Sequence, residues 1–249
     1  MEANLRTRID ALGRKRGIPE AVVEEALRHL RPSISLCEAD GSLWQEGVRP
    51  AAMAGGLPRL PEGMEWPDSD HPHLATIDCA ALPRAVLDID LPQDGHLVLF
   101  SDFDDFDAPV LLHIPAGTET TEREPRIVDE DWPVYEPVPL YLLVVWHIDN
   151  WGDIPGALEF TEHNPSGANQ IDTFIDDMSH LINGADVARI RLGGHTRYFQ
   201  NPPEKDGVTH FLSVSGDEFE KTSILAFAGT REDITARRYE NLGYYLAPC

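Results

Sequence analysis

The sequence predicts an α+β protein, built from a duplicated, mostly antiparallel β unit with a short N-terminal helical arm. One observation is a repeated glycine pair: Gly55-Gly56 and Gly193-Gly194 lie about 138 positions apart, and each precedes a strand-like run. A second observation is that, from residue 33 onward, short β-rich runs alternate with Gly, Pro and Asp. Repetition at so long a period indicates two related halves rather than a solenoid.

The helical arm is expected to span residues 1–32. Apolar residues recur there at helical spacing in two stretches. Pro19 suits the first turn of the second helix, and Pro32 cannot continue it. The apolar positions are Leu5, Ile9 and Leu12 in the first helix and Val22, Val23, Ala26, Leu27 and Leu30 in the second.

Residues 33–249 are expected to form one domain with two β halves, at about 50–150 and 185–249. A helix between the halves is predicted from apolar residues at helical spacing, ended by Asn183-Gly184. The segment 116–137, rich in Thr, Glu, Asp and Pro, is expected to be an exposed excursion. The apolar helix positions are Ile171, Phe174, Ile175, Met178, Leu181 and Ile182. The expected strands are Ser33–Cys37, His73–Ile77, His96–Ser101, Val110–Ile114, Leu140–Ile148, Arg189–Leu192, Thr209–Val214, Ser223–Ala228 and Gly243–Leu246.

The charge is strongly acidic: 20 Lys and Arg against 43 Asp and Glu give a net charge of −23. The basic side chains are concentrated in residues 1–31, which hold seven basic and five acidic residues. A nucleic-acid-binding surface needs a basic stripe, so we expect no binding to DNA or RNA. An anionic surface favours cationic partners. A generally acidic proteome would explain the same balance without any partner, and this alternative stays open.

The three cysteines, Cys37, Cys79 and Cys249, are far apart and lack any CxxC spacing. They are therefore interpreted as free thiols in a reducing compartment. The charged N-terminus has no secretory h-region, and the longest apolar run, 140–148, is about half of what a bilayer requires. We expect a cytoplasmic protein without a membrane segment.

The glycine pairs Gly55-Gly56 and Gly193-Gly194 are interpreted as structural turns, because glycine permits positive φ or close backbone approach. Phosphate binding by their N–H groups is the weaker alternative, since neither pair opens an evident helix. No nucleophile, metalloprotease or phosphate-loop motif is present. Cys79 lacks an oriented base and is expected to be a small buried hydrophobe. We therefore predict no catalytic residue and no cofactor.

Two groups of side chains contain residue types that ligate metals, and neither group is expected to bind a metal ion. The acidic run Asp102, Asp104, Asp105 and Asp107 lacks the glycine and the glutamate of a calcium-binding loop, so a solvated strand end is favoured. His71 and His73 form an H-x-H, to which His147 and Asp149 could contribute, but Pro72 places the pair in a turn. We expect surface histidines there and no metal.

Aromatic side chains flank the acidic, proline-rich segment. Aromatic residues bordered by carboxylates suit docking of a basic protein, and the candidates for partner binding are Trp132, Tyr135 and Trp151. Trp66 and Trp146 are expected to lie in the core instead.

A series of glycine and proline landmarks resembles the YwqG-like family, a bacterial domain of unknown function. The landmarks in the first half are Gly55-Gly56-Leu57-Pro58, Leu60-Pro61, Trp66-Pro67, Ile77-Asp78, Leu82-Pro83, Leu91-Pro92 and Gly95 to Asp102. Those in the second half are Leu192-Gly193-Gly194, Tyr198 to Pro202 and Arg231 to Cys249. The resemblance covers roughly residues 50–249. Members usually carry Gln-Ile-Asp on the strand after each glycine pair, where this chain has Thr76-Ile77-Asp78 and Ser213-Val214-Ser215.

The resemblance implies an α+β fold from a duplicated β unit and implies no reaction. Some relatives neighbour polymorphic-toxin genes, which suggests toxin neutralisation. Two functions stay open. The first is a non-enzymatic, acidic protein-binding module, of the immunity type where its partner is a basic toxin. The alternative is a small-molecule-binding protein or hydrolytic enzyme with a pocket between the two β halves.

Overall fold

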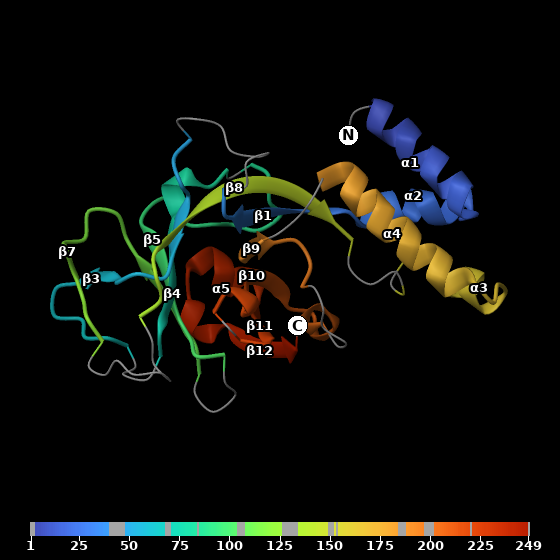
Figure 1. The fold of residues 1–249 in the computed structure, drawn as a ribbon. Coiled ribbons are helices and arrows are strands. Elements are labelled where there is room, and N and C mark those ends of the chain that lie inside the picture. Colours follow the sequence, from blue (N-terminus) through green and yellow to red (C-terminus); the bar gives the residue numbers. More distant parts are fainter. Residues whose placement is uncertain are drawn as a thin grey trace.

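The computed structural model describes residues 3–39, 48–67, 71–83, 85–103, 108–125, 134–148, 152, 154–183, 188–196, 202–219 and 221–248. Its main feature is a curled sheet of ten strands in the order β12-β11-β10-β9-β1-β8-β2-β4-β5-β6 (Figure 1). Every neighbouring pair in this sheet is antiparallel. The α+β class with a mostly antiparallel sheet is confirmed.

Two central strands join the flanks of the sheet. β1 (Arg31–Cys37) and β8 (Val138–His147) pair over seven consecutive positions, from Arg31↔His147 to Cys37↔Tyr141. Outward from β8 lie β2 (Ala52–Ala54), β4 (His73–Asp78), β5 (His96–Phe100) and β6 (Val110–Ile114). Outward from β1 lie β9 (Ile190–Gly193), β10 (Thr209–Ser215), β11 (Ser223–Gly229) and β12 (Gly243–Pro248).

All nine strands that the sequence predicts are confirmed, with small differences at their ends. The sequence missed β2 and the pair β3 (Arg59–Pro61) and β7 (Thr120–Glu122), which form a separate two-stranded sheet. Each of these strands has three residues, too few to show an alternating pattern. β7 lies inside the segment predicted as an exposed excursion, so part of that segment is ordered by pairing with β3.

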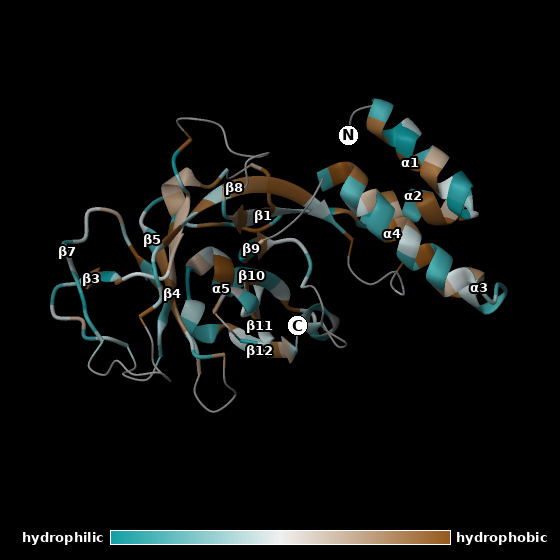
Figure 2. Cartoon of the chain, in the orientation of Figure 1, coloured by the Kyte–Doolittle hydropathy of each residue, from teal (hydrophilic) through white to brown (hydrophobic). Residues whose placement is uncertain are grey.

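One hydrophobic core lies inside the curl of the sheet and draws side chains from both flanks. Leu74, Ile77 and Leu97 come from the β4–β5 side, and Leu192 and Phe211 come from the β9–β10 side. Figure 2 shows β8, between the flanks, as a predominantly hydrophobic strand. The two flanks of the sheet therefore share one hydrophobic core.

The helices form a second layer at one end of β1 and β8 (Figure 1). They are α1 (Ala3–Arg16), α2 (Glu20–His29), α3 (Ala157–Glu162) and α4 (Gly167–Asn183). The three helices that the sequence predicts are confirmed. They share their own apolar cluster, in which Ile9 and Val22 meet Phe174 and Met178. The N-terminal helices therefore pack against α4.

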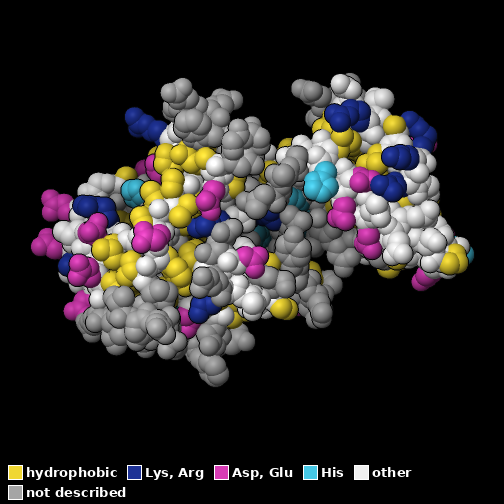
Figure 3. Space-filling view, in the orientation of Figure 1, with side chains coloured by type: hydrophobic (Ala, Val, Ile, Leu, Met, Phe, Trp, Pro, Cys, Tyr) yellow, Lys and Arg dark blue, Asp and Glu magenta, His cyan; other side chains and the backbone are white. Residues whose placement is uncertain are grey.

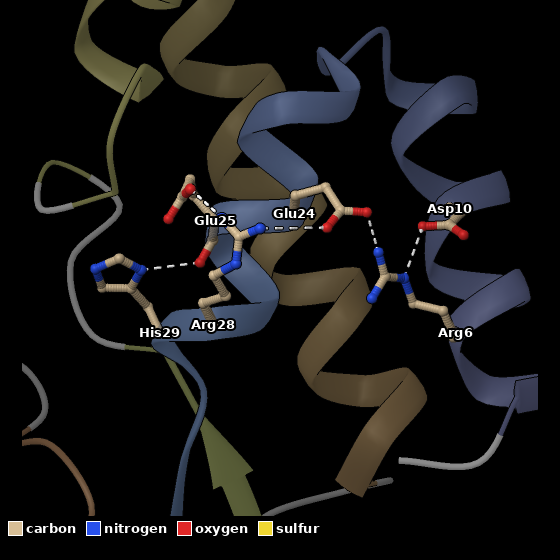
Figure 4. A network of polar contacts seen from close by, with 6 residues as sticks. All are labelled: Arg6, Asp10, Glu24, Glu25, Arg28 and His29. Atoms are coloured by element: carbon tan, nitrogen blue, oxygen red, sulfur yellow. Dashed lines mark hydrogen bonds and ion pairs between the residues drawn. The ribbon is translucent and has the colours of Figure 1, made fainter.

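Ion pairs link these helices at the surface (Figure 4). Arg6 of α1 bonds to Asp10 of its own helix and to Glu24 of α2, while Arg28 contacts Glu24 and Glu25. Arg16 bonds to Asp177 of α4. These side chains are substantially exposed, so solvent screens each pair and its contribution to stability is small.

The remaining helical elements connect strands. α5 (Arg231–Ala236) is capped by the Thr230 side chain, which accepts the Asp233 N–H. Short 3-10 helices occur at Cys79–Ala81 (η1), Pro203–Asp206 (η3), Asp217–Phe219 (η4) and Tyr239–Asn241 (η5). Among the described residues, none of the helices combines the length and apolar character needed to cross a bilayer.

Candidate functional site

The glycine pairs lie at the ends of β2 and β9. All four glycines have positive φ, between 65° and 72°. At Gly55 a Cβ would lie 2.4 Å from the Glu136 carbonyl oxygen, and at Gly194 it would lie 2.9 Å from the Ser33 Cβ. Both positions therefore require glycine for the backbone conformation and for the close approach of a neighbouring segment.

Each glycine pair holds one buried histidine. The Nδ1–H of His73 donates to the Gly56 carbonyl at 3.0 Å, and the Nδ1–H of His210 donates to the Gly193 carbonyl at 2.9 Å. A carbonyl only accepts, so the bond fixes the proton of each ring on Nδ1. Burial lowers the pKa of both histidines to about 4, so both rings are neutral near pH 7.

The two rings differ at their second nitrogen. The Nε2 of His73 accepts the Thr76 hydroxyl at 3.0 Å, whereas the Nε2 of His210 is buried without a hydrogen-bond partner. Glu204, Arg191 and His195 act on His210 electrostatically: the carboxylate of Glu204 raises its pKa, while Arg191 and His195 lower it. Desolvation outweighs all three effects.

The segment that follows the second glycine pair contacts the helical layer. The Nε2–H of His195 donates to the His29 carbonyl at the last turn of α2, at 3.1 Å. Next along the chain, Thr196 donates from its N–H and its hydroxyl to the two carboxylate oxygens of Glu204, at 2.8 and 2.6 Å. Glu204 lies in η3, so the segment after β9 is tied to both α2 and η3.

His71 and His73 are buried, so the expectation of surface histidines in a turn was wrong. The His71 side chain is 1% exposed, and neither of its ring nitrogens has a hydrogen-bond partner. Its carbonyl accepts the Trp66 indole N–H at 2.8 Å, and Trp66 in turn lies edge-on to Phe100. Burial is tolerated at His73 because its two nitrogens find partners. His147 is also buried, and Asp149 lies outside the described residues.

Asp102 is 8% exposed, so the prediction of a solvated strand end is wrong at this residue. The end of β5 is held against the start of β4, because the Ser101 N–H donates to the Pro72 carbonyl. Phe103 follows with a φ of 62°, and its N–H donates to the Ser101 hydroxyl at 3.0 Å. Asp104, Asp105 and Asp107 lie outside the described residues.

The described part of the chain has no cluster of three or more His, Cys, Asp or Glu side chains arranged for a metal ion. Cys79 is fully buried, as predicted, and burial raises the pKa of its thiol to about 12. Such a thiol is protonated and unreactive near pH 7. A cavity of about 60 Å³ lies where Arg231 of α5 bonds to Asp88; this is far below the size of a typical small-molecule site.

Of the aromatic docking candidates, Tyr135 packs edge-on against Phe219, with ring centroids 4.8 Å apart. Trp132 and Trp151 lie outside the described residues. Trp66 is half-buried. Trp146 is 41% exposed, so the prediction that it lies in the core was wrong. The reason is that Trp146 shares a strand face with Leu140 and Leu142, which pack in the sheet core, but lies beyond the end of that core.

Val144, also 41% exposed, accompanies Trp146 on this far end of β8. The two residues are two positions apart and project from the same face of the strand. The backbone of Trp146 is closed on the side away from β1 by the Asn183 side chain, which accepts its N–H and donates to its carbonyl, both at 2.8 Å. Two large apolar side chains are thus partly exposed to solvent beside a strand edge. The run 140–148 is apolar at nearly every position, so the sequence carried no signal for this exposure.

Comparison with protein families matches residues 53–247 to a family described as "Domain of unknown function (DUF1963)". The match begins after β1 and includes the remaining strands of the large sheet. No curated protein matches the chain.

Proposed function

Since the chain belongs to the DUF1963 family, a domain of unknown function, its activity has to be inferred from its own residues, and we propose that it is a non-enzymatic, acidic protein-binding module. Within that family we assign it to the YwqG-like proteins, on the glycine and proline landmarks of residues 55–102. The single observation that carries the proposal is the exposure of Val144 and Trp146 at the far end of β8.

A large aromatic side chain that is half in solvent suits the centre of an interface. Tryptophan is enriched among the residues that dominate binding energy, because it buries a large apolar area on docking. Val144 extends the apolar surface along the same strand face. Single exposed apolar residues are common on protein surfaces. A neighbouring pair of them at a strand edge supports the docking of a partner protein there. The surface defined by Val144 and Trp146 is called the β8 surface below.

The charge of the protein indicates the chemistry of the partner. A net charge of −23 attracts a basic protein at long range and repels acidic ones. Figure 3 shows Asp and Glu side chains spread over the sheet part, with several Lys and Arg side chains gathered over the helices. The resemblance to the YwqG-like family favours a basic toxin as this partner, so we propose an immunity-type, cytoplasmic role.

The proposed interface is centred on β8. It is not centred on Trp132, Tyr135 and Trp151, the aromatic residues that were predicted from the sequence to bind a partner. Tyr135 is committed to packing with Phe219, which limits what it offers a partner. Trp132 and Trp151 lie outside the described residues and stay candidates for partner binding.

We also propose that the two flanks of the sheet arose by duplication. In support, the order β2-β4-β5-β6 outward from β8 mirrors β9-β10-β11-β12 outward from β1. His73 and His210 each follow by 17 positions the glycine whose carbonyl they bond. Each histidine also precedes a register shift in its ladder, His73/Ala75 in one and His210/Leu212 in the other.

Site-specific crosslinking tests the protein-binding function. A photoreactive phenylalanine analogue replaces Trp146 in one variant and Leu158 of α3, which is more exposed, in a control variant. In host cells, the proposal expects a discrete adduct with a basic protein from position 146 only. Val144→Asp should abolish that adduct, and the purified partner should bind the wild type more weakly as salt rises. Equal adducts from both positions, or an adduct that Val144→Asp leaves unchanged, would contradict the proposal.

One observation favours a second candidate function, the binding of a small polar molecule. Both ring nitrogens of His71 are buried without partners, and such groups cost roughly 1–3 kcal/mol unless satisfied. A bound molecule would satisfy them. Thermal-shift screening of polar metabolites tests this candidate: stabilisation that His71→Phe removes and that the exposed-site control His180→Phe preserves supports it, and no such compound argues against it.

A further inference from the structure

We propose that β8 recruits its partner by strand addition: an extended segment of a basic protein pairs with the open backbone edge at Leu142 and Val144. This inference rests on the proposed protein-binding function and adds its mode of recognition. It concerns the backbone of β8, whereas the β8 surface is defined by side chains.

The direction of the β8 backbone follows from its fixed contacts. The Leu140 carbonyl accepts the Ala51 N–H at 2.9 Å, on the side of β2, and the Trp146 backbone is bonded by Asn183 on the side away from β1. In an antiparallel strand, alternate residues direct their N–H and C=O groups to the same side. Leu142 and Val144 lie two and four positions after Leu140, so they belong to the same alternating set of residues as Leu140 and Trp146. Their backbone groups therefore face away from β1.

This edge of β8 has no strand partner among the residues that the structure describes. β2 pairs with β8 only over 138–140, and the chain bends at Ala51, so residues 48–50 do not continue the pairing. Asn183 closes the edge at Trp146. Two N–H donors and two C=O acceptors, those of Leu142 and Val144, are left between these points. Such an edge is a template on which another strand can form.

The size of the gap sets the length of the added strand. From Leu140 to Trp146 the strand rises by about 20 Å, at roughly 3.4 Å for each residue. About five extended residues of a partner would fit alongside. Val144 and Trp146 project from one face there, so every second side chain of the partner would pack on them and the others would face away.

Charge identifies the occupant as a basic segment. A second copy of this chain would bring another net charge of −23 to the interface and be repelled. The helix that supplies Asn183 is itself acidic: α4 contains Asp172, Asp176 and Asp177 and no Lys or Arg. Asp177 is paired with Arg16, and Asp176 is exposed. Lysine or arginine at the outward positions of an added strand would be attracted by the net negative charge of the protein.

Amide hydrogen exchange on the full chain tests strand addition directly. The probe is a short capped peptide that alternates lysine with valine, compared with the same peptide carrying glutamate for lysine. The lysine peptide should slow exchange at Leu142 and Val144 by about 10-fold or more. The Trp146 amide, already bonded to Asn183, should change little. No protection at millimolar lysine peptide, or equal protection by the glutamate peptide, would overturn the inference.

Two substitutions separate the backbone from the side chain. Val144→Pro removes the edge N–H without removing a bond to β1, and it should weaken peptide binding about 3- to 10-fold. Val144→Thr keeps the N–H and the branched shape, and it should bind like the wild type. If Val144→Pro unfolds the protein, the exchange data on the wild type still decide the question.

The failures of the two proposals are distinguishable. If Trp146 crosslinks to a basic partner but the complex leaves Leu142 and Val144 exchanging freely, strand addition is wrong and the protein-binding function stands. If these amides are protected without any peptide in a concentration-dependent dimer, the occupant is a second copy and the inference is likewise wrong. Measurement of the molecular mass in solution identifies that case.

Discussion

Asn183 closes the backbone of Trp146 with two hydrogen bonds of 2.8 Å, made by the last residue of α4 to the far end of β8. The amide side chain takes the position that a neighbouring strand would occupy. It both protects the strand end from unwanted pairing and marks the limit of the open edge. It also fixes α4, and with it the helical layer, to the sheet.

Replacing this cap should loosen the junction between helix and sheet. We expect Asn183→Ala to lower the free energy of unfolding by about 1–2 kcal/mol, because two backbone groups lose their partners. Asn169→Ala, on an exposed position of the same helix, is the matched control and should cost much less. Denaturant unfolding of both variants measures the difference. An equal loss for both variants would show that the Asn183 bonds contribute nothing.

Acid should destabilise the protein through His73 and His210. Their pKa of about 4 in the folded state lies below the ordinary value of 6.5, so the unfolded chain takes up protons first as the pH falls. Stability is therefore fully present above about pH 6.5 and is lost progressively towards pH 4, by an amount on the order of 3 kcal/mol for each histidine.

His210→Asn keeps a donor for the Gly193 carbonyl and removes the titration. Its unfolding free energy should fall less steeply than that of the wild type between pH 6.5 and 4. His180→Asn, at an exposed position, is the matched control for the substitution itself. Identical slopes for wild type and His210→Asn would refute the assigned role of burial.

Gly55 should tolerate substitution less well than Gly63, a second glycine with positive φ. Gly55→Ala adds both left-handed strain and a clash of its Cβ with the Glu136 carbonyl oxygen. At Gly63, φ is also positive, but a Cβ would meet open space. We expect Gly63→Ala to cost about 1 kcal/mol and Gly55→Ala clearly more. Thermal unfolding compares them, and equal melting temperatures would contradict the close-approach argument.

Local patterns in the sequence predicted most of the helices and strands, and the features that they did not predict share a cause. Strands of four to ten residues carry enough alternation or apolar length to be recognised, whereas three-residue strands such as β2 do not. Where the core under one face of β8 ends is set by tertiary packing, so the exposure of Trp146 could not be predicted from the sequence of β8 alone. Burial of His73 depends on a carbonyl 17 positions earlier, a tertiary partner that sequence spacing alone does not identify.

The Cys79 thiol should resist alkylation in the folded protein. Its raised pKa of about 12 leaves almost no thiolate near pH 8, and its side chain is fully buried. In a Cys37→Ser, Cys249→Ser background, iodoacetamide should label Cys79 only when denaturant unfolds the chain. Mass spectrometry follows the labelling. Rapid modification under native conditions would restore Cys79 as a candidate nucleophile.

The segment before the family match should be indispensable for the sheet, although the match begins at residue 53. β1 lies between β8 and β9, and its Ile34 and Leu36 are fully buried in the core that both flanks share. Deleting residues 1–37 removes the strand that joins the flanks and exposes an edge on each.

We expect this truncated chain to aggregate or to lose its cooperative unfolding transition. Deleting only residues 1–17 removes α1 and the Arg16–Asp177 pair but leaves β1 in place, so a cooperative, less stable protein should remain. Calorimetry and solution mass distinguish the two chains. A stable, cooperative product from the longer deletion would mean that β8 and β9 can pair without β1, and that the N-terminal segment is an addition to a self-sufficient domain.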